Sequence, residues 1–196
     1  MTTNVAVVGL GFMGRRYVEI LARLPEAKVV AVCDVRAELA GEIAAAHGAQ
    51  SYTDVDTVLQ ASAVDALFVC TPEDRHVEPA LRALAAGKAV MIEKPIAHTL
   101  AAANQIAEAA RASGALLMVG HLLRFEPRWV AARRAVAAGD IGAITSIATR
   151  RVGNILDQTV LGGRTTIPLY YGVHDLDILR WFVGAEVETI YAARRT

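Results

Sequence analysis

The sequence has little cysteine and no excess of charge of either sign. Among 196 residues there are two cysteines, Cys33 and Cys70, and each lies within an apolar run. A disulfide-stapled scaffold is therefore not expected, and we interpret both thiols as small buried hydrophobic groups. Basic and acidic residues each number 20, so the chain offers no net positive charge to nucleic acid or to an anionic membrane surface.

Long apolar runs are also missing. No run approaches the roughly 20 residues that a membrane-spanning helix needs, and the start "MTTNVAVVGLG" has no basic region typical of a secretory signal. Hydrophobic residues nevertheless make up 54% of the chain and charged residues 20%, a composition that suits a well-buried core. We therefore expect a cytoplasmic protein that binds neither nucleic acid nor membrane.

Strand-like and helix-like segments alternate over residues 1–121. Continuous apolar runs are typical of strands buried on both faces, and they occur at residues 4–10, 28–34, 64–70, 89–94 and 115–121. The segments between them have helical spacing, and Thr99 is a candidate N-cap for the helix that ends at Gly114. This alternation predicts an α/β domain with a doubly wound parallel sheet.

The pattern changes after His121. Helical spacing appears at 124–142 and 171–184, and alternating strand-like segments appear at 143–152 and 186–196. The stretch 153–168 reads as a long loop of the kind that often carries function. Because two strands rarely form a stable sheet, we expect residues 122–196 to be the start of an incomplete α+β domain with an open sheet.

A glycine-rich loop follows the first predicted strand. In "VVGLGFMG", Gly9, Gly11 and Gly14 form G-x-G-x-x-G, with Phe12 and Met13 between the last two glycines. The motif lies between a strand and a helix, which is the setting in which such a loop binds a dinucleotide pyrophosphate. The free N–H groups of the following helix would face the phosphates. The alternative reading, a tight turn without a ligand, we consider the weaker one.

Charged residues continue this signal at the end of the second predicted strand. Asp34 comes 20 residues after Gly14, where a carboxylate accepts the ribose hydroxyls of NAD and repels the 2′-phosphate of NADP. Arg36 keeps NADP possible, since a guanidinium pairs with that phosphate or stacks on adenine.

Two further pairs of residues follow later strands. Thr71 and Pro72 come after the strand 64–70, and Glu93 and Lys94 end the apolar run that begins at Ala89. Ligands of open α/β sheets bind outside the carboxyl ends of the strands, so we expect these residues to share one edge with the glycine loop. A cis Lys94–Pro95 bond would turn the lysine toward that edge.

Four segments together resemble the Gfo/Idh/MocA oxidoreductases, relatives of glucose–fructose oxidoreductase and inositol dehydrogenase: "GLGFMG", "TPEDRHVEPALRALAAGKAVMIEKPIA", "GHLLRFEPRW" and "GVHDLDILRW". The resemblance implies an N-terminal Rossmann domain, a C-terminal domain with an open sheet, and a homo-oligomer. It also implies NAD(P)-linked hydride transfer to or from a secondary alcohol of a sugar, nucleotide-sugar or cyclitol.

The same resemblance implies roles for individual residues. Lys94 matches the family's active-site lysine, beside Glu93, and His174 matches its active-site histidine. Asp177 follows one helical turn after His174 and would orient the imidazole. In the reaction, His174 would take the hydroxyl proton while the Lys94 ammonium binds the same oxygen.

Three further residues match segments near the cofactor and the substrate. His121 and Arg124 match the segment that lines the substrate cleft, and His76 matches a histidine near the nicotinamide.

One position departs from the family pattern D-x-G-x-H-x-x-D. Tyr170 stands where the first carboxylate is expected, and a phenol accepts a proton less readily than a carboxylate does. Two alternatives therefore stay open beside the dehydrogenase: an NAD-using glycosidase of the same family, and a catalytically impaired nucleotide-binding module or fragment. No metal site is expected, because His174, Asp175 and Asp177 have no further ligand cluster near them in the sequence.

Overall fold

The computed structural model describes residues 1–60, 63–152 and 165–193. The chain divides into two compact units, Met1–Gly120 and His121–Thr196, which are treated separately. No helix among the described residues is long and apolar enough to cross a membrane.

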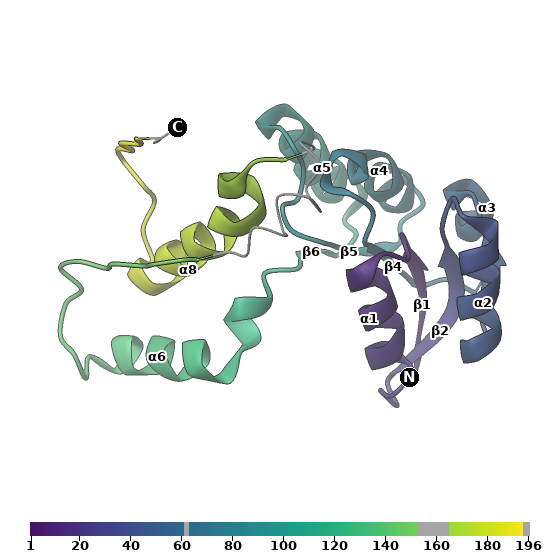
Figure 1. Ribbon diagram of the computed structural model, residues 1–196, viewed down its shortest axis with the longest axis horizontal. Helices are drawn as coiled ribbons and strands as arrows, with labels where there is room; N and C mark the ends of the chain where they lie inside the picture. Colours follow the sequence, from purple (N-terminus) through teal and green to yellow (C-terminus); the bar gives the residue numbers. More distant parts are fainter. Residues whose placement is uncertain (61–62, 153–164, 194–196) are drawn as a thin grey trace. The chain divides into compact units, whose positions relative to one another are not determined.

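The first unit is built on one parallel sheet (Figure 1). Its six strands lie in the order β3-β2-β1-β4-β5-β6, which is the order of a doubly wound dinucleotide-binding fold with its switch point between β1 and β4. The strands are β1 (Thr3–Val8), β2 (Ala27–Cys33), β3 (Gln50–Tyr52), β4 (Ala66–Val69), β5 (Ala89–Ile92) and β6 (Leu117–Val119). The predicted α/β fold is confirmed.

Helices cover both faces of this sheet, and each face has its own hydrophobic core. On β1, Val5 and Val7 pack against one pair of helices, α1 (Phe12–Leu21) and α2 (Ala37–His47). Ala6 and Val8, the alternate residues, belong to the core of the opposite face. That face is covered by α3 (Val55–Gln60), α4 (Val77–Ala85) and α5 (Leu100–Ser113). Successive strand residues point to opposite faces, so a strand buried on both faces is apolar throughout.

Two elements of the first unit were not among the predicted ones. They are β3 and α3, and both are short. The β3 sequence, Gln-Ser-Tyr, lacks an apolar run, and it is a strand because it pairs with β2 at the edge of the sheet. Tertiary pairing decided the structure here, as it often does for weak strand sequences.

The second unit contains helices whose ends follow from the sequence. They are the 3₁₀ helix η2 (Leu122–Phe125), α6 (Pro127–Ala138), the π-helical turn η3 (Pro168–Gly172) and α8 (Val173–Val183). Pro127 occupies the first turn of α6, and Gly139 and Gly184 end α6 and α8 in the left-handed conformation. Both predicted helices of this unit are confirmed.

The two strands predicted for the second unit are wrong for the residues that the structure describes. Residues 143–152 and 186–193 have no regular secondary structure. A strand is stabilised by hydrogen bonds to a neighbouring strand, and neither segment pairs with one here. Alternating polarity alone therefore does not make these segments strands. Residues 194–196 and the predicted loop residues 153–164 lie outside the described residues.

The start of α5 has the predicted cap, and it can be tested. The Thr99 hydroxyl accepts the backbone N–H of Ala102 at 3.2 Å, and Gly114 closes the helix at φ 66°. We expect Thr99→Ala to lower the free energy of unfolding by about 1 kcal/mol, because an N–H of the first turn loses its acceptor. Urea unfolding followed by circular dichroism measures this. Thr99→Ser, which keeps the hydroxyl, is the control, and equal stability of the Ala variant would contradict the capping role.

Candidate active site

The residues predicted to bind a dinucleotide lie where the strands of the sheet end. Gly9 follows β1, Asp34 follows β2, Glu93 follows β5 and Gly120 follows β6. All strands are parallel, so these positions share the carboxyl edge of the sheet. Thr71 joins them two residues after β4.

Each of the three positions in the loop is occupied by glycine for a different structural reason. Gly9 has φ +88°, and a Cβ on it would lie 2.6 Å from the backbone N of Thr71. A Cβ on Gly14 would lie 1.8 Å from the carbonyl oxygen of Gly9, so both positions are set by packing within the fold. A Cβ on Gly11 would meet nothing within 4 Å. Gly11 therefore borders open space, as a glycine does when a phosphate approaches the backbone.

The first turn of α1 follows directly on this loop. Phe12 begins the helix and is 79% exposed, and Met13 is half-buried. No acidic side chain lies in that turn, so its N–H groups have no anionic partner within the turn itself. The helix N-terminus is suited to an anion.

Asp34 connects the glycine loop to the end of β2. The residue is 8% exposed, and its side chain accepts the backbone N–H of Leu10 at 2.8 Å. Arg36 donates to both carboxylate oxygens, from Nε at 2.9 Å and from Nη2 at 3.1 Å, and through its backbone N–H at 3.0 Å. Burial raises the pKa of Asp34, but the hydrogen bonds from Arg36 and Leu10 outweigh it and lower the pKa to about 2. Asp34 is thus an anion held against the loop.

His76 is buried beside the same edge. It is 1% exposed, its Nδ1 lies 3.0 Å from the carbonyl oxygen of Pro95, and its Nε2 lies 2.8 Å from that of Thr71. The Thr71 hydroxyl donates to the carbonyl of Arg75, and Pro72 is exposed. Both ring nitrogens of His76 therefore face main-chain carbonyl oxygens.

The turn after β5 carries the predicted active-site lysine. Glu93 is 5% exposed; its Oε1 accepts the Tyr17 hydroxyl at 2.8 Å, and its Oε2 accepts the backbone N–H of Lys94 at 3.1 Å. The Lys94–Pro95 peptide bond is cis, as predicted. Burial, followed by the nearby Glu93 carboxylate, raises the pKa of Tyr17 above its ordinary value, so the phenol keeps its proton and donates it. The role of Tyr17 was not predicted, because no local pattern links it to Glu93.

Two of the predicted site residues of the second unit, Arg124 and Asp177, form an ion pair. Arg124 donates to both oxygens of Asp177, from Nη2 at 2.7 Å and from Nε at 2.9 Å, and its guanidinium lies over the Trp181 ring. Asp177 is 8% exposed, and His121 Nδ1 lies 3.7 Å from it. Bidentate pairs of this kind fix both side chains. Arg124, predicted to line the substrate cleft, is thus bound to a carboxylate of its own unit.

His174 and Tyr170 lie on either side of the junction between η3 and α8. His174 is in the first turn of α8, and Tyr170 is in η3 with its ring edge-on to Tyr171. Asp175 in the same turn accepts two hydrogen bonds from Arg151, at 2.6 and 2.9 Å.

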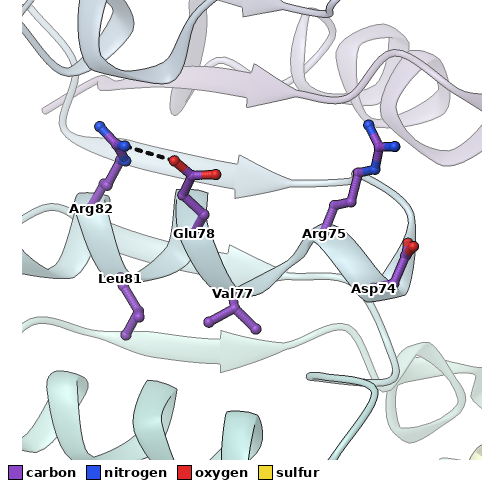
Figure 2. Close-up of a pocket in the computed structure, with 6 residues that line it drawn as sticks. All are labelled: Asp74, Arg75, Val77, Glu78, Leu81 and Arg82. Carbon is purple, nitrogen blue, oxygen red and sulfur yellow. Dashed lines mark hydrogen bonds and ion pairs between the residues drawn. The ribbon is translucent and has the colours of Figure 1, made fainter.

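An open groove of about 680 Å³ lies along η1 (Glu73–Arg75) and α4. In Figure 2, Glu78 and Arg82 point to one side of α4 and pair with each other, while Val77 and Leu81 point to the other. Arg82 also pairs with Asp56. No predicted site residue is among those that line the groove: Asp74, Arg75, Val77, Glu78, Leu81 and Arg82. The carboxyl edge remains the candidate site.

The described parts of the two units contain no set of side chains suited to bind a metal ion. No group of three or more His, Cys, Asp or Glu side chains there is arranged to hold an ion. The residues of the carboxyl edge fit a dinucleotide instead, because Gly11 leaves space beside a helix N-terminus and Asp34 presents an anionic acceptor.

Two inositol dehydrogenases have sequences similar to that of this chain. Inositol 2-dehydrogenase 2 of Saccharopolyspora erythraea is 34% identical over 98% of this chain and 57% of its own length. The inositol 2-dehydrogenase of Rubrobacter xylanophilus is 34% identical over 95% of this chain and 54% of its own length. This chain thus spans a little over half the length of these relatives.

A solved structure and a family model extend the likeness. The scyllo-inositol dehydrogenase of Lactobacillus casei, determined with NAD(H) and scyllo-inositol, superposes with a TM-score of 0.84 at 26% identity, over 94% of this chain and 57% of that one. The model GFO_IDH_MocA, described as an oxidoreductase family with an NAD-binding Rossmann fold, matches residues 3–121. That match covers more than half of the sequence, so the chain belongs to the GFO_IDH_MocA oxidoreductase family.

Proposed function

We propose that this chain is part of an NAD-dependent dehydrogenase that oxidises a secondary alcohol of a cyclitol or sugar, or reduces the corresponding ketone. The observation that carries the proposal is the carboxyl edge of the sheet. The glycine loop, the Asp34 carboxylate and the buried turn that bears Lys94 all lie along it. Relatives that are inositol dehydrogenases support a cyclitol as the substrate.

NAD is the proposed cofactor in preference to NADP. The Asp34 carboxylate is held as an anion, and an anion there repels a 2′-phosphate. Ribose hydroxyls would need the oxygens that Arg36 now contacts, and the exposed Arg36 side chain has room to turn away. The residues proposed to hold the cofactor are Gly9, Gly11, Phe12, Met13, Gly14, Asp34, Arg36, Thr71, Pro72 and Lys94; His76 and Glu93, which are also predicted from the sequence to lie at the cofactor, are 1% and 5% exposed beside them.

The proposed chemistry divides between two side chains. NAD, when bound, supplies the hydride acceptor. The Lys94 ammonium hydrogen-bonds the substrate oxygen and stabilises its alkoxide character, and the His174 imidazole takes the hydroxyl proton. The Arg124–Asp177 pair joins η2 to the helix that presents His174.

A second candidate is a nucleotide-binding protein with impaired catalysis. It is favoured by Tyr170, which stands where the family pattern has a carboxylate. An NAD-using glycosidase would share the cofactor residues but would accumulate no NADH. We further propose a cytoplasmic homo-oligomer, in keeping with the family resemblance and with two free, buried cysteines.

The proposal is tested by incubating the chain, and the full gene product where it is longer, with NAD and a panel of inositols, sugars and sugar nucleotides. NADH absorbance reports oxidation, and calorimetry reports NAD binding. We expect NADH to accumulate with at least one cyclitol or sugar. NAD binding without NADH formation over the whole panel would favour the impaired module, and product release without NADH would favour the glycosidase.

Asp34 is predicted to set the choice of cofactor. In Asp34→Asn the amide oxygen still accepts the Leu10 N–H, but the negative charge is lost. We expect the ratio of NADP to NAD dissociation constants, measured by calorimetry, to fall roughly 10-fold or more, as for the loss of a charged hydrogen-bond acceptor. Asp65→Asn is the matched control: Asp65 also accepts a backbone N–H, from Asn4, but at the amino edge of the sheet. An unchanged ratio in Asp34→Asn would remove this residue from cofactor selection.

Lys94 is predicted to act in the chemical step. We expect Lys94→Ala to lower kcat at least about 100-fold, because the developing alkoxide loses its charged donor. The NAD dissociation constant should change little, since the glycine loop and Asp34 stay intact. Lys88→Ala, one residue before β5 at the opposite edge, should keep wild-type kcat. Turnover of Lys94→Ala equal to wild type would show that the lysine is not part of the mechanism.

A further inference from the structure

The turn that bears Lys94 is held on one flank by a side chain from the nucleotide-binding helix. Tyr17 comes from α1, 76 residues away in sequence, and donates its hydroxyl to Glu93 Oε1 at 2.8 Å. The other oxygen of Glu93 accepts the backbone N–H of Lys94 at 3.1 Å. A Cβ on Gly120 would lie 3.2 Å from Glu93 Oε1, so glycine there leaves the carboxylate its place. Glu93 therefore ties α1 to the lysine's own backbone.

The other flank is held by His76. Its Nδ1 faces the carbonyl oxygen of Pro95, and its Nε2 faces that of Thr71. Carbonyl oxygens only accept hydrogen bonds, so the ring donates to one of them when neutral and to both when doubly protonated. With both nitrogens protonated, the buried ring bridges the loop after β4 to the residue that follows Lys94; with one proton it is bonded to one of these two segments and packed against the other.

We propose that Tyr17 and His76 are positioning residues for Lys94: together they hold the turn 93–95 so that its lysine is aimed from the carboxyl edge. This rests on the proposed function, in which Lys94 binds the substrate oxygen. A lysine side chain is long and flexible, so any movement of its backbone adds to the uncertainty in the position of its ammonium group. A fixed backbone is therefore needed to place the ammonium. Because Tyr17 belongs to the helix that follows the glycine loop, the loop and the lysine are held by one hydrogen-bonded path.

Neither residue needs to touch a ligand for this role. His76 is 1% exposed, and Tyr17 packs edge-on against Phe68 with ring centroids 5.3 Å apart. The Tyr17 hydroxyl donates its proton to a hydrogen bond with Glu93. Apolar side chains would fill the same space, so the polar atoms of Tyr17 and His76 are explained by their contacts with residues 93 and 95.

The test uses the lysine content of the chain. There are three lysines, Lys28, Lys88 and Lys94, so limited acetylation followed by mass spectrometry yields the reactivity of Lys94 relative to two internal references. The variant is Tyr17→Phe, which keeps the ring against Phe68 and removes the hydroxyl. Tyr52→Phe, which removes the hydroxyl that donates to Gln50 on β3, is the control.

We expect Tyr17→Phe to change the relative acetylation rate of Lys94 several-fold, with NAD present and absent, and to lower kcat roughly 10- to 100-fold, as misplacement of a catalytic group does. The KM for NAD and its dissociation constant should stay near wild type. Tyr52→Phe should leave all of these unchanged. A merely structural role for Tyr17 would lower thermal stability without changing the relative reactivity of Lys94.

His76 supplies an independent arm. His76→Gln retains a donor for one carbonyl and should shift Lys94 reactivity less than His76→Phe does, while His47→Gln at the end of α2 should have no effect. If Lys94→Ala abolishes turnover but Tyr17→Phe reacts and turns over like wild type, the positioning proposal fails while the proposed function stands. If the wild type oxidises no alcohol, the acetylation ratios still decide the positioning proposal.

Discussion

Parallel pairing is the constraint on which the site of the first unit depends. In a parallel sheet every strand ends at the same edge, so residues that follow different strands are brought together although they are far apart in the sequence. Gly9, Asp34, Thr71 and Glu93 owe their proximity to this geometry and to nothing local. The edge also presents the helix N-terminus after the glycine loop, which adds positive potential where a pyrophosphate would lie.

Close packing at that edge leaves few choices of side chain. Gly9 and Gly14 are required by contacts inside the fold, and Gly11 borders open space, so a single motif combines a structural demand with a binding one. Glu93 shows the same combination in a charged residue. A buried carboxylate is costly unless donors meet it, and here Tyr17 and the backbone of Lys94 do so. The groups that satisfy Glu93 are also those that fix the lysine.

Elements with a strong periodic signal could be predicted from the sequence, and those that depend on distant partners could not. The long apolar strands and the helices closed by Gly48, Gly114 and Gly184 follow from local rules. The edge strand β3 was missed because pairing with β2, not its composition, makes it a strand. The strand predicted at residues 143–152 was wrong for the converse reason: these residues alternate in polarity, but they pair with no strand among the described residues. The glycine loop and Asp34 were predictable because their spacing is local, whereas the Tyr17–Glu93 and Arg124–Asp177 contacts span 76 and 53 residues.

Contacts within the second unit favour one side chain over its neighbours as the proton acceptor of the proposed reaction. Tyr170 replaces a carboxylate, and a neutral phenol donates a hydrogen bond to an alkoxide more readily than it takes up a proton. Asp177 is held by two guanidinium nitrogens of Arg124, so its charge is already compensated within the unit. Asp175 is similarly engaged by Arg151. With its neighbouring carboxylates committed to arginines, His174 is the group on α8 whose chemistry suits proton transfer near neutral pH, and the reaction proposed here therefore depends on its imidazole.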